Sequence, residues 1–383
     1  MDRDESRGLS GFIATVIIFI LLFGCSPGGR DASPQEKGQQ DQTSTAESAP
    51  QSSSSGKAAV SPLPEESGQD SVTLVIGAYS VVKDVMQRIL PEFAADWKAK
   101  TGQQVVFQES YEASGTQARS IAGGLEADVA LFSMEGDVDK LVQAGLVPAD
   151  WQALDAYGGM VTGSIVVLGT REGNPHQIRD WSDLTKPGIQ VLYPNPKTSG
   201  GAQWDINAIY GAGLLEAKER GEDSQRRAKE LLMSVHRNVI SMDKSGRASM
   251  AAFEYGVGDV IVTYENEILS RMQAGVPYEL VRPERTIRID NPVVVVDQYA
   301  QKHGTTDIAQ AFVDYLREPK AQRLLAEAGF RPVSPSVRAE TGDRYPESAG
   351  LFGIEDMGGW KHIRETLYSK RGIWYEVLAG IEE

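Results

Sequence analysis

Cysteine is almost missing from this 383-residue chain, in which Cys25 is the only one. A single cysteine cannot form a disulfide within the chain, so no disulfide framework supports the fold. The sequence also lacks an H-E-x-x-H zinc motif and a G-x-S-x-G nucleophile elbow, and its four histidines lie outside the candidate binding segments. These absences argue against an enzyme, a bound metal and a cofactor, and they favour a binding protein.

Positive charge is scarce as well. The chain has 38 Lys plus Arg against 53 Asp plus Glu, a formal net charge of -15. This balance argues against nucleic acid as a partner. An anionic ligand would have to be held by local hydrogen-bond donors, because the overall field of the protein repels it.

The one long apolar run, LSGFIATVIIFILLFG at residues 9–24, ends at Cys25. It is short for a membrane span, which needs about 20 residues, and it fits the apolar region of a secretory signal peptide better. Leu22, Phe23 and Gly24 resemble a bacterial lipobox, although acidic residues offset the basic ones before the run. We therefore expect a lipoprotein signal peptide over residues 1–25 and a lipid-anchored protein outside the cytoplasm of a bacterium, in the periplasm or at the cell surface. An uncleaved anchor helix is the alternative.

Large apolar side chains are nearly missing from residues 26–71, which are rich in Ser, Gln, Pro and Gly. Such a segment cannot bury enough surface to offset its ordering entropy, so we expect a disordered tether. The remaining chain is too long for one typical core and suits two lobes.

The rest of the chain alternates short β-branched runs with amphipathic segments, a pattern that predicts parallel sheets covered by helices on both faces. In such sheets, ligands bind at the carboxyl ends of strands, where helices begin. Strands are expected at 72–79, 105–110, 127–132, 164–170, 189–195, 259–266 and 292–297, and helices at 82–97, 117–123, 138–144, 202–220, 224–235, 248–255, 307–316 and 321–328.

Serine, often followed by glycine, marks four of the expected junctions between a strand and a helix. These junctions lie at Ser80, at Ser114-Gly115, at Ser199-Gly200-Gly201 and at Ser245-Gly246. Each serine alone is explained by helix capping. Together they suggest several helix N-termini aimed at one point, where bare amides and helix dipoles bind an anion without any cation.

Several segments resemble the periplasmic sulfate- and thiosulfate-binding proteins, the solute receptors of ABC importers. They include SGTQARSIAGGLEADV (114–129), NPKTSGGAQW (195–204) and GVGDVIVTYENE (256–267). The resemblance implies a type II periplasmic-binding-protein fold, in which two α/β lobes enclose a ligand cleft. It implies lobe one at 72–157 plus 272–340, lobe two at 158–271 and a C-terminal helical extension at 341–383. It also implies a monomer that delivers its anion to an ABC permease.

Carried over position by position, the family's ligand contacts fall on Ser80, Ser114, Ser199, Gly200, Gly201, Gly246 and Tyr264. The family usually has Asp at position 80 and Ala at position 246, but a backbone amide is supplied by any residue except proline. At position 264 the sulfate receptors have Trp. A tyrosine there can accept as well as donate a hydrogen bond, which leaves the identity of the oxyanion open.

The charges of the seven positions bear on the choice of anion. None is acidic, which favours a fully ionised anion such as sulfate or thiosulfate over hydrogen phosphate, whose proton needs an acceptor. Receptors for molybdate, tungstate or phosphate, and a sensory oxyanion-binding domain, remain alternatives. Lys197 is expected to reach solvent, and Arg247 to orient loops rather than to touch the ligand.

Overall fold

The computed structural model describes residues 71–346 and 348–380. The expected signal peptide, Cys25 and nearly all of the expected tether lie outside these residues. Among the described helices, none has the length and apolar character needed to cross a membrane.

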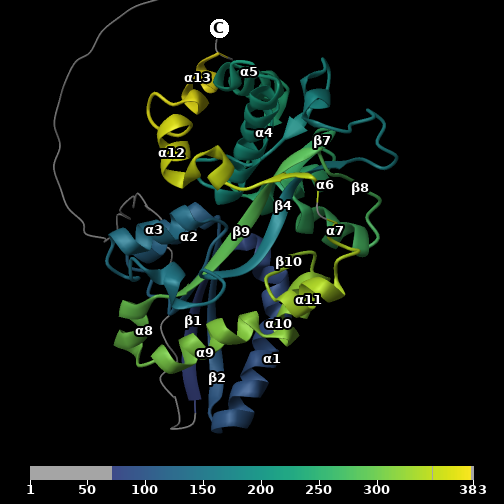
Figure 1. The fold of residues 1–383 in the computed structure, drawn as a ribbon. Helices are drawn as coiled ribbons and strands as arrows, with labels where there is room; N and C mark the ends of the chain where they lie inside the picture. The colour runs from purple at the N-terminus through teal and green to yellow at the C-terminus, as the bar shows by residue number, and fades with distance from the viewer. Residues whose placement is uncertain (1–70, 347, 381–383) are drawn as a thin grey trace, which may run out of the picture. The chain divides into compact units, whose positions relative to one another are not determined.

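The first lobe is built on a parallel sheet of β1 (Ser71–Tyr79), β2 (Gln104–Glu112) and β3 (Val129–Leu131). Each strand leads into a helix: η1 (Ser80–Val82) with α1 (Lys83–Thr101), then α2 (Ser114–Ala122) and α3 (Glu135–Gln143). The apolar face expected for α1 is confirmed, because Met86, Ile89 and Phe93 are buried in the core. The later helices α8 (Asp297–His303), α9 (Thr306–Arg317) and α10 (Pro319–Glu327) complete this lobe (Figure 1).

The second lobe repeats this plan around β5 (Val191–Leu192), β6 (Val239–Ser241) and β7 (Val260–Tyr264), which are also parallel. The helix α4 (Gly200–Glu219) follows β5, and α5 (Ser224–His236) packs against it. The helices α6 (Gly246–Glu254) and α7 (Glu265–Gln273) follow β6 and β7. Two short elements, η3 (Trp181–Thr185) and β8 (Glu279–Val281), lie at the edges.

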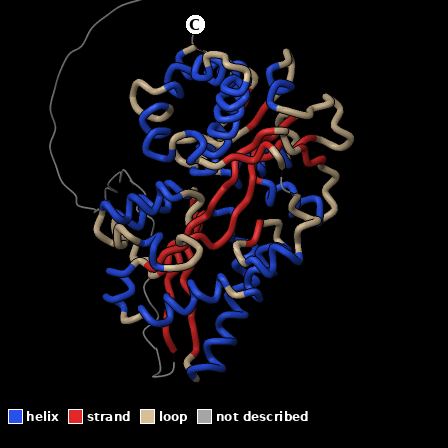
Figure 2. Tube along the Cα trace, in the orientation of Figure 1, coloured by secondary structure: helices blue, strands red, loops and turns tan. Residues whose placement is uncertain are grey.

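Two long strands, β4 (Met160–Thr170) and β9 (Arg285–Val295), carry the chain between the lobes. They pair with each other, and β9 also pairs with β3 while β4 pairs with β7, all antiparallel. The resulting order is β2-β1-β3-β9-β4-β7-β5-β6, and Figure 2 shows the strands as a continuous band. The expectation of parallel sheets holds within each lobe but is wrong for this central pair, because the chain crosses once in each direction.

The passage from the first lobe follows η2 (Trp151–Leu154), close to the boundary expected at residue 157. The strand β8 still pairs with β4 at residues 168–170, which belong to the second lobe. The division of the chain into 72–157 plus 272–340 and 158–271 therefore remains a proposal, and this pairing favours a return point in β9.

The C-terminal segment contains β10 (Arg331–Pro332), α11 (Pro335–Glu340), β11 (Gly350–Phe352), η4 (Glu355–Met357), α12 (Gly359–Thr366) and α13 (Ile373–Ala379). Aromatic contacts fix the last two helices over the second lobe (Figure 1). Trp360 meets Trp204 of α4 edge to face at 4.8 Å, and Trp374 meets His236 of α5 at 5.0 Å. These helices therefore cover the outer side of α4 and α5.

Candidate functional site

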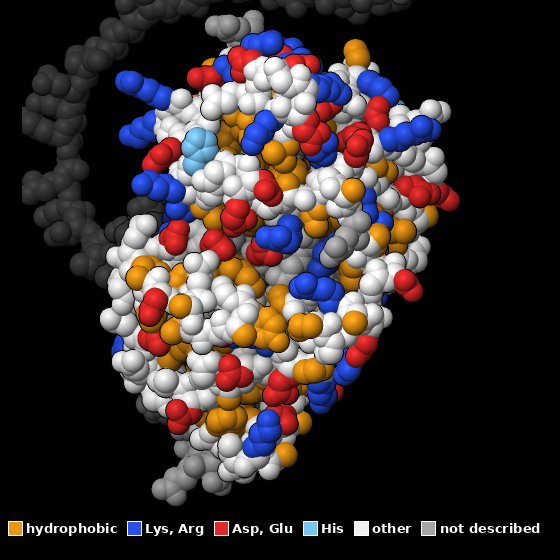
Figure 3. Space-filling model, in the orientation of Figure 1, with side chains coloured by type: hydrophobic (Ala, Val, Ile, Leu, Met, Phe, Trp, Pro, Cys, Tyr) orange, Lys and Arg blue, Asp and Glu red, His pale blue; other side chains and the backbone are white. Residues whose placement is uncertain are grey.

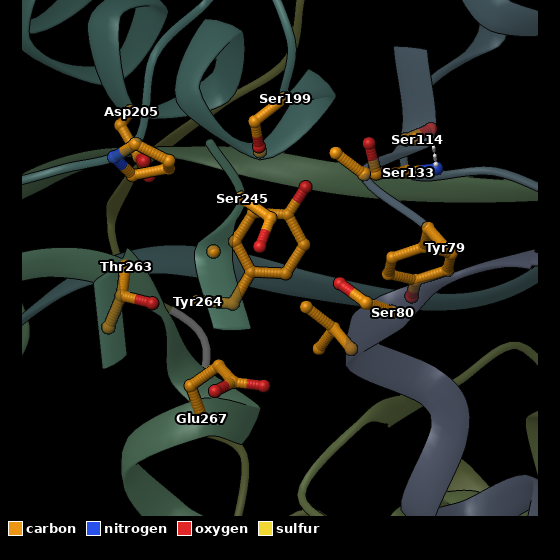
Figure 4. Close-up of a pocket in the computed structure, with 15 residues that line it drawn as sticks. Tyr79, Ser80, Ser114, Ser133, Ser199, Asp205, Ser245, Thr263, Tyr264 and Glu267 are labelled. Carbon is orange, nitrogen blue, oxygen red and sulfur yellow. Dashed lines mark hydrogen bonds between the residues drawn. The ribbon is translucent and has the colours of Figure 1, made fainter. Parts of the chain in front are cut away.

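A pocket lies where the carboxyl ends of strands from both lobes meet the first turns of the following helices (Figure 4). Its cavity volume for the centres of water-sized spheres is about 20 Å³, within a space of about 380 Å³ that includes open solvent. Its lining is mostly small and hydroxyl side chains: Tyr79, Ser80, Val81, Ala113, Ser114, Ser133, Pro194, Ser199, Gly201, Asp205, Ser245, Gly246, Thr263, Tyr264 and Glu267.

Five helical segments begin at this pocket: η1, α2, α4, α6 and α7. The first amides of a helix have no partner within it, and the helix dipole places partial positive charge there. Ser199 caps α4 by accepting from the Ala202 amide at 3.4 Å, and Ser245 caps α6 by accepting from the Ala248 amide at 3.1 Å. Both serines accept in these bonds, so their hydroxyl protons remain available to a ligand.

The structure brings together the residues predicted for the site. Six of the seven, Ser80, Ser114, Ser199, Gly201, Gly246 and Tyr264, line the pocket. Gly200 is buried at the start of α4, next to the lining rather than in it. A Cβ atom built on Gly200 would lie 2.2 Å from Ser133 Oγ of the first lobe. Gly200 therefore permits the close approach of the two lobes.

The Ser114 hydroxyl is not free to donate a hydrogen bond to a ligand. It donates to Asp137 Oδ2 at 2.5 Å and accepts from the Ser133 amide at 2.9 Å. A hydroxyl has only one proton to give. In this arrangement the donor that Ser114 can offer an anion is its backbone amide, the first of α2.

Three buried hydroxyls around the pocket have no hydrogen-bond partner in the described structure: those of Tyr79, Ser133 and Tyr264. A buried polar group without a partner is costly, so such a cluster is suited to a ligand that accepts hydrogen bonds. Burial raises the pKa of Tyr79 and of Tyr264 well above the usual value, so both phenols keep their protons as donors. Sequence reasoning identified Tyr264 but missed Tyr79 and Ser133.

Two carboxyl groups also line the pocket, Asp205 and Glu267, and sequence reasoning missed both. Glu267 Oε2 lies 3.0 Å from the guanidinium of Arg271, but burial still raises the pKa of Glu267. Burial raises the pKa of Asp205 well above the usual value. None of the seven predicted contacts is acidic, but the pocket lining contains these two carboxyl groups.

Ser133 and Asp205 differ in how well the sequence could have revealed them as pocket residues. Ser133 follows the expected strand at 127–132, so the rule that ligands collect at strand ends could have found it. Asp205 lies inside α4 within the apolar stretch WDINAIY, where its polarity was the only clue.

The two basic residues beside the site in the sequence, Lys197 and Arg247, have partners outside the pocket lining. The Arg247 guanidinium lies 2.8 Å from Asp84 Oδ2 in α1, so it joins the two lobes, in keeping with a role outside the ligand contacts. Lys197 is exposed, and its Nζ lies 5.3 Å from the centre of the Tyr375 ring. Basic and acidic side chains are interspersed on the face in Figure 3. Over residues 71–346 and 348–380 there is also no group of acidic, His or Cys side chains that could hold a metal ion.

Two α/β lobes, two long strands between them and helix N-termini around one pocket define a solute-binding protein of the periplasmic type. Consistent with this, residues 74–331 match the family model of the bacterial extracellular solute-binding proteins. This is a family of transport components rather than enzymes.

Similarity to individual proteins shows which group within this family the chain belongs to. The chain is 39% identical over 306 residues to a sulfate-binding protein of Synechococcus elongatus, covering 80% of this chain and 85% of that one. It is 33% identical over 307 residues to a thiosulfate-binding protein of Pseudomonas aeruginosa, covering 79% and 91% of the two chains. The solved structure of the sulfate-binding protein SubI from Mycobacterium tuberculosis is similar with a TM-score of 0.70 and 37% identity, over 78% of this chain and 99% of that one. The chain belongs to the sulfate- and thiosulfate-binding protein family of bacterial extracellular solute-binding proteins.

Proposed function

We propose that this protein captures sulfate or thiosulfate outside the cytoplasm and delivers it to an ABC importer. The observation that carries the proposal is the set of helix N-termini at one pocket, together with the unpartnered hydroxyls of Tyr79, Ser133 and Tyr264. These groups can all donate to an oxyanion, and no cation is needed in the pocket. Ser80, Ser114, Ser199, Gly200, Gly201, Gly246 and Tyr264 are the proposed ligand contacts.

Capture works by closure of the two lobes. Ser80 and Ser114 belong to the first lobe, whereas Ser199 and Tyr264 belong to the second. An anion held by donors from both sides is bound more tightly when the lobes are together, so it shifts the population toward the closed form. The permease would then recognise the closed form.

Titration calorimetry tests this function directly. Sulfate, thiosulfate, molybdate, tungstate and phosphate should be measured on the same preparation of residues 71–383. The proposal expects sulfate or thiosulfate to bind tightest. Tighter binding of molybdate or phosphate would assign the site to another oxyanion, and no binding of any of the five would refute the proposal.

Membrane attachment is a separate proposal that depends on Cys25. If its thiol is acylated after signal cleavage, cells grown with labelled palmitate should label the wild-type protein, and Cys25→Ala should remove the label. Cys25→Ser offers a near-isosteric control without the nucleophilic thiol. Label that persists in either variant would contradict the lipobox interpretation.

The ion pair between Arg247 and Asp84 spans the lobes and should favour closure slightly. Both side chains are partly exposed, 33% for Arg247 and 67% for Asp84. Exposed pairs contribute about 0.2–1 kcal/mol, so Arg247→Ala should weaken anion affinity by less than about fivefold. A double-mutant cycle with Asp84→Ala, read out by calorimetry, should show positive coupling that salt reduces. Strictly additive effects would show that the pair does not act in closure.

A further inference from the structure

Asp205 lies in the second turn of α4 with 1% of its surface exposed, and it lines the ligand pocket. Figure 4 shows it on the same side of the pocket as Ser199. Its Oδ1 atom has no hydrogen-bond partner among the described residues. A buried carboxyl thus lines a pocket that also contains hydroxyl side chains, helix N-termini and a second carboxyl, Glu267.

The phenols of Tyr193 and Tyr368 are close enough to feel the charge of Asp205, but both have other hydrogen-bond partners. The Tyr193 hydroxyl forms a hydrogen bond with Nδ1 of His236, a ring that is neutral because burial lowers its pKa to about 4. Tyr368 donates to Asn207 Oδ1 at 2.8 Å. Neither phenol forms a hydrogen bond with Asp205 among the described residues, so neither stabilises a negative charge there in this way.

Tyr264 also feels the charge of Asp205, and it lines the pocket together with Tyr79 and Glu267. Burial is the cause of the shift in the pKa of Asp205, with no basic side chain opposing it. An isolated buried carboxylate is costly, and such groups hold their protons instead.

We propose that Asp205 stays protonated and donates its hydroxyl to the bound oxyanion, so the protein retains one proton beside the dianion. This inference rests on the proposed function and adds Asp205 to the ligand contacts. A carboxylic acid is a donor, whereas an ionised carboxylate would only repel the anion. Affinity is therefore full below the pKa of Asp205. Above that pKa the anion affinity falls by at most about tenfold for each pH unit, because one proton must be taken up when the anion binds.

Infrared difference spectroscopy on residues 71–383 reads the proton directly. A protonated carboxyl gives a carbonyl band that a carboxylate lacks. The wild-type spectrum minus that of Asp205→Asn should contain this band at neutral pH, and sulfate should shift it. If the difference spectrum shows a carboxylate band instead, the inference is overturned. This measurement does not depend on affinity, so it still reports the state of Asp205 if no anion binds and the proposed function fails.

Sulfate titrations give a second, independent test of the role of Asp205. Asp205→Ala removes the donor and should weaken binding by roughly tenfold at neutral pH. Asp205→Asn keeps a hydrogen-bond donor that cannot ionise. The sulfate affinity of the wild type should therefore fall at high pH, whereas the sulfate affinity of Asp205→Asn should not. Asp205→Asn binding sulfate tenfold tighter than the wild type would show that the native carboxyl is ionised and repels the anion. The inference would then be wrong.

Discussion

Gly200→Val should reduce anion affinity by roughly five- to 150-fold, since overpacking of a closed interior costs about 1–3 kcal/mol. A Cβ atom on Gly200 would meet Ser133 Oγ at 2.2 Å and Asp137 Oδ2 at 3.2 Å, both from the first lobe. The branched methyl groups of valine add further clashes. Since the obstacle lies between the lobes, the variant should fold but fail to close.

The measurements are calorimetry with sulfate and thermal unfolding with and without the anion. A bound ligand raises the unfolding temperature, so the wild type should shift and Gly200→Val should not. In the absence of anion the two proteins should unfold alike, because Gly200 is not in the left-handed region that requires glycine. Normal affinity in Gly200→Val would show that the lobes need not approach so closely.

Gly246 supplies the matched comparison at the start of α6. A Cβ atom there would have only an ordinary contact with Val81 at 3.7 Å. Gly246→Ala should therefore cost much less than Gly200→Ala, although both glycines begin helices at the same pocket. Equal losses would mean that the two glycines act through helix geometry rather than through the spacing of the lobes.

Periodicity predicted the elements within each lobe better than those between the lobes. The strand β9 spans Arg285–Val295, but only its apolar end, at residues 292–297, was expected. Its first half, RTIRIDN, carries charges that are satisfied outside the core: Arg285 pairs with Glu219 at 2.6 Å, and Arg288 with Asp290 at 3.0 Å. The alternation of Ile287 and Ile289, both buried, with Arg288 and Asp290 is itself a strand pattern, and the sequence prediction overlooked it.

The start of helix α7 could not be predicted from the sequence for a different reason. Residues 259–266 were expected to be one strand, but α7 already begins at Glu265. Glu265 is fully buried because Arg282 and Arg331 each approach its carboxylate at 2.7 Å. Both partners are distant in sequence, so no local pattern could reveal that a buried acid starts a helix here. The strand itself was predicted, but it ends at Tyr264, two residues before the expected end.

The site could be predicted as far as it is built from helix starts. The Ser and Gly residues at four junctions have a local signature, and the structure brings those junctions together. Ser133 and Asp205 reach the pocket through the packing of β3 and α4 across the lobes. Trp204 Nε1, for example, donates to the Ser133 carbonyl at 2.6 Å. Contacts of this kind depend on how the lobes meet, which the sequence alone does not specify.

Tyr264 stands where the sulfate-receptor pattern has tryptophan, and its environment makes it a donor. The residue ends β7, and 4% of its surface is exposed. Its hydroxyl has no partner in the described structure. Because burial raises the pKa of Tyr264 well above the usual value, the phenol does not ionise beside an anion. A neutral donor in a closed pocket strengthens binding through a charge-assisted hydrogen bond.

Tyr264→Phe removes this hydroxyl and keeps the ring, so the lobes should still close. Loss of one hydrogen bond to a charged group costs about 1.5–3 kcal/mol, or roughly ten- to a hundredfold in sulfate affinity. If the phenol instead accepts a proton from the ligand, hydrogen phosphate should lose more affinity than sulfate, so both anions are titrated on both proteins. Tyr375→Phe is the control, because Tyr375 lies on the outer helix α13 and is 37% exposed. Equal affinities of Tyr264→Phe and the wild type for every anion would show that the phenol points away from the ligand, and the donor at this position would have to be sought in the amides of α7.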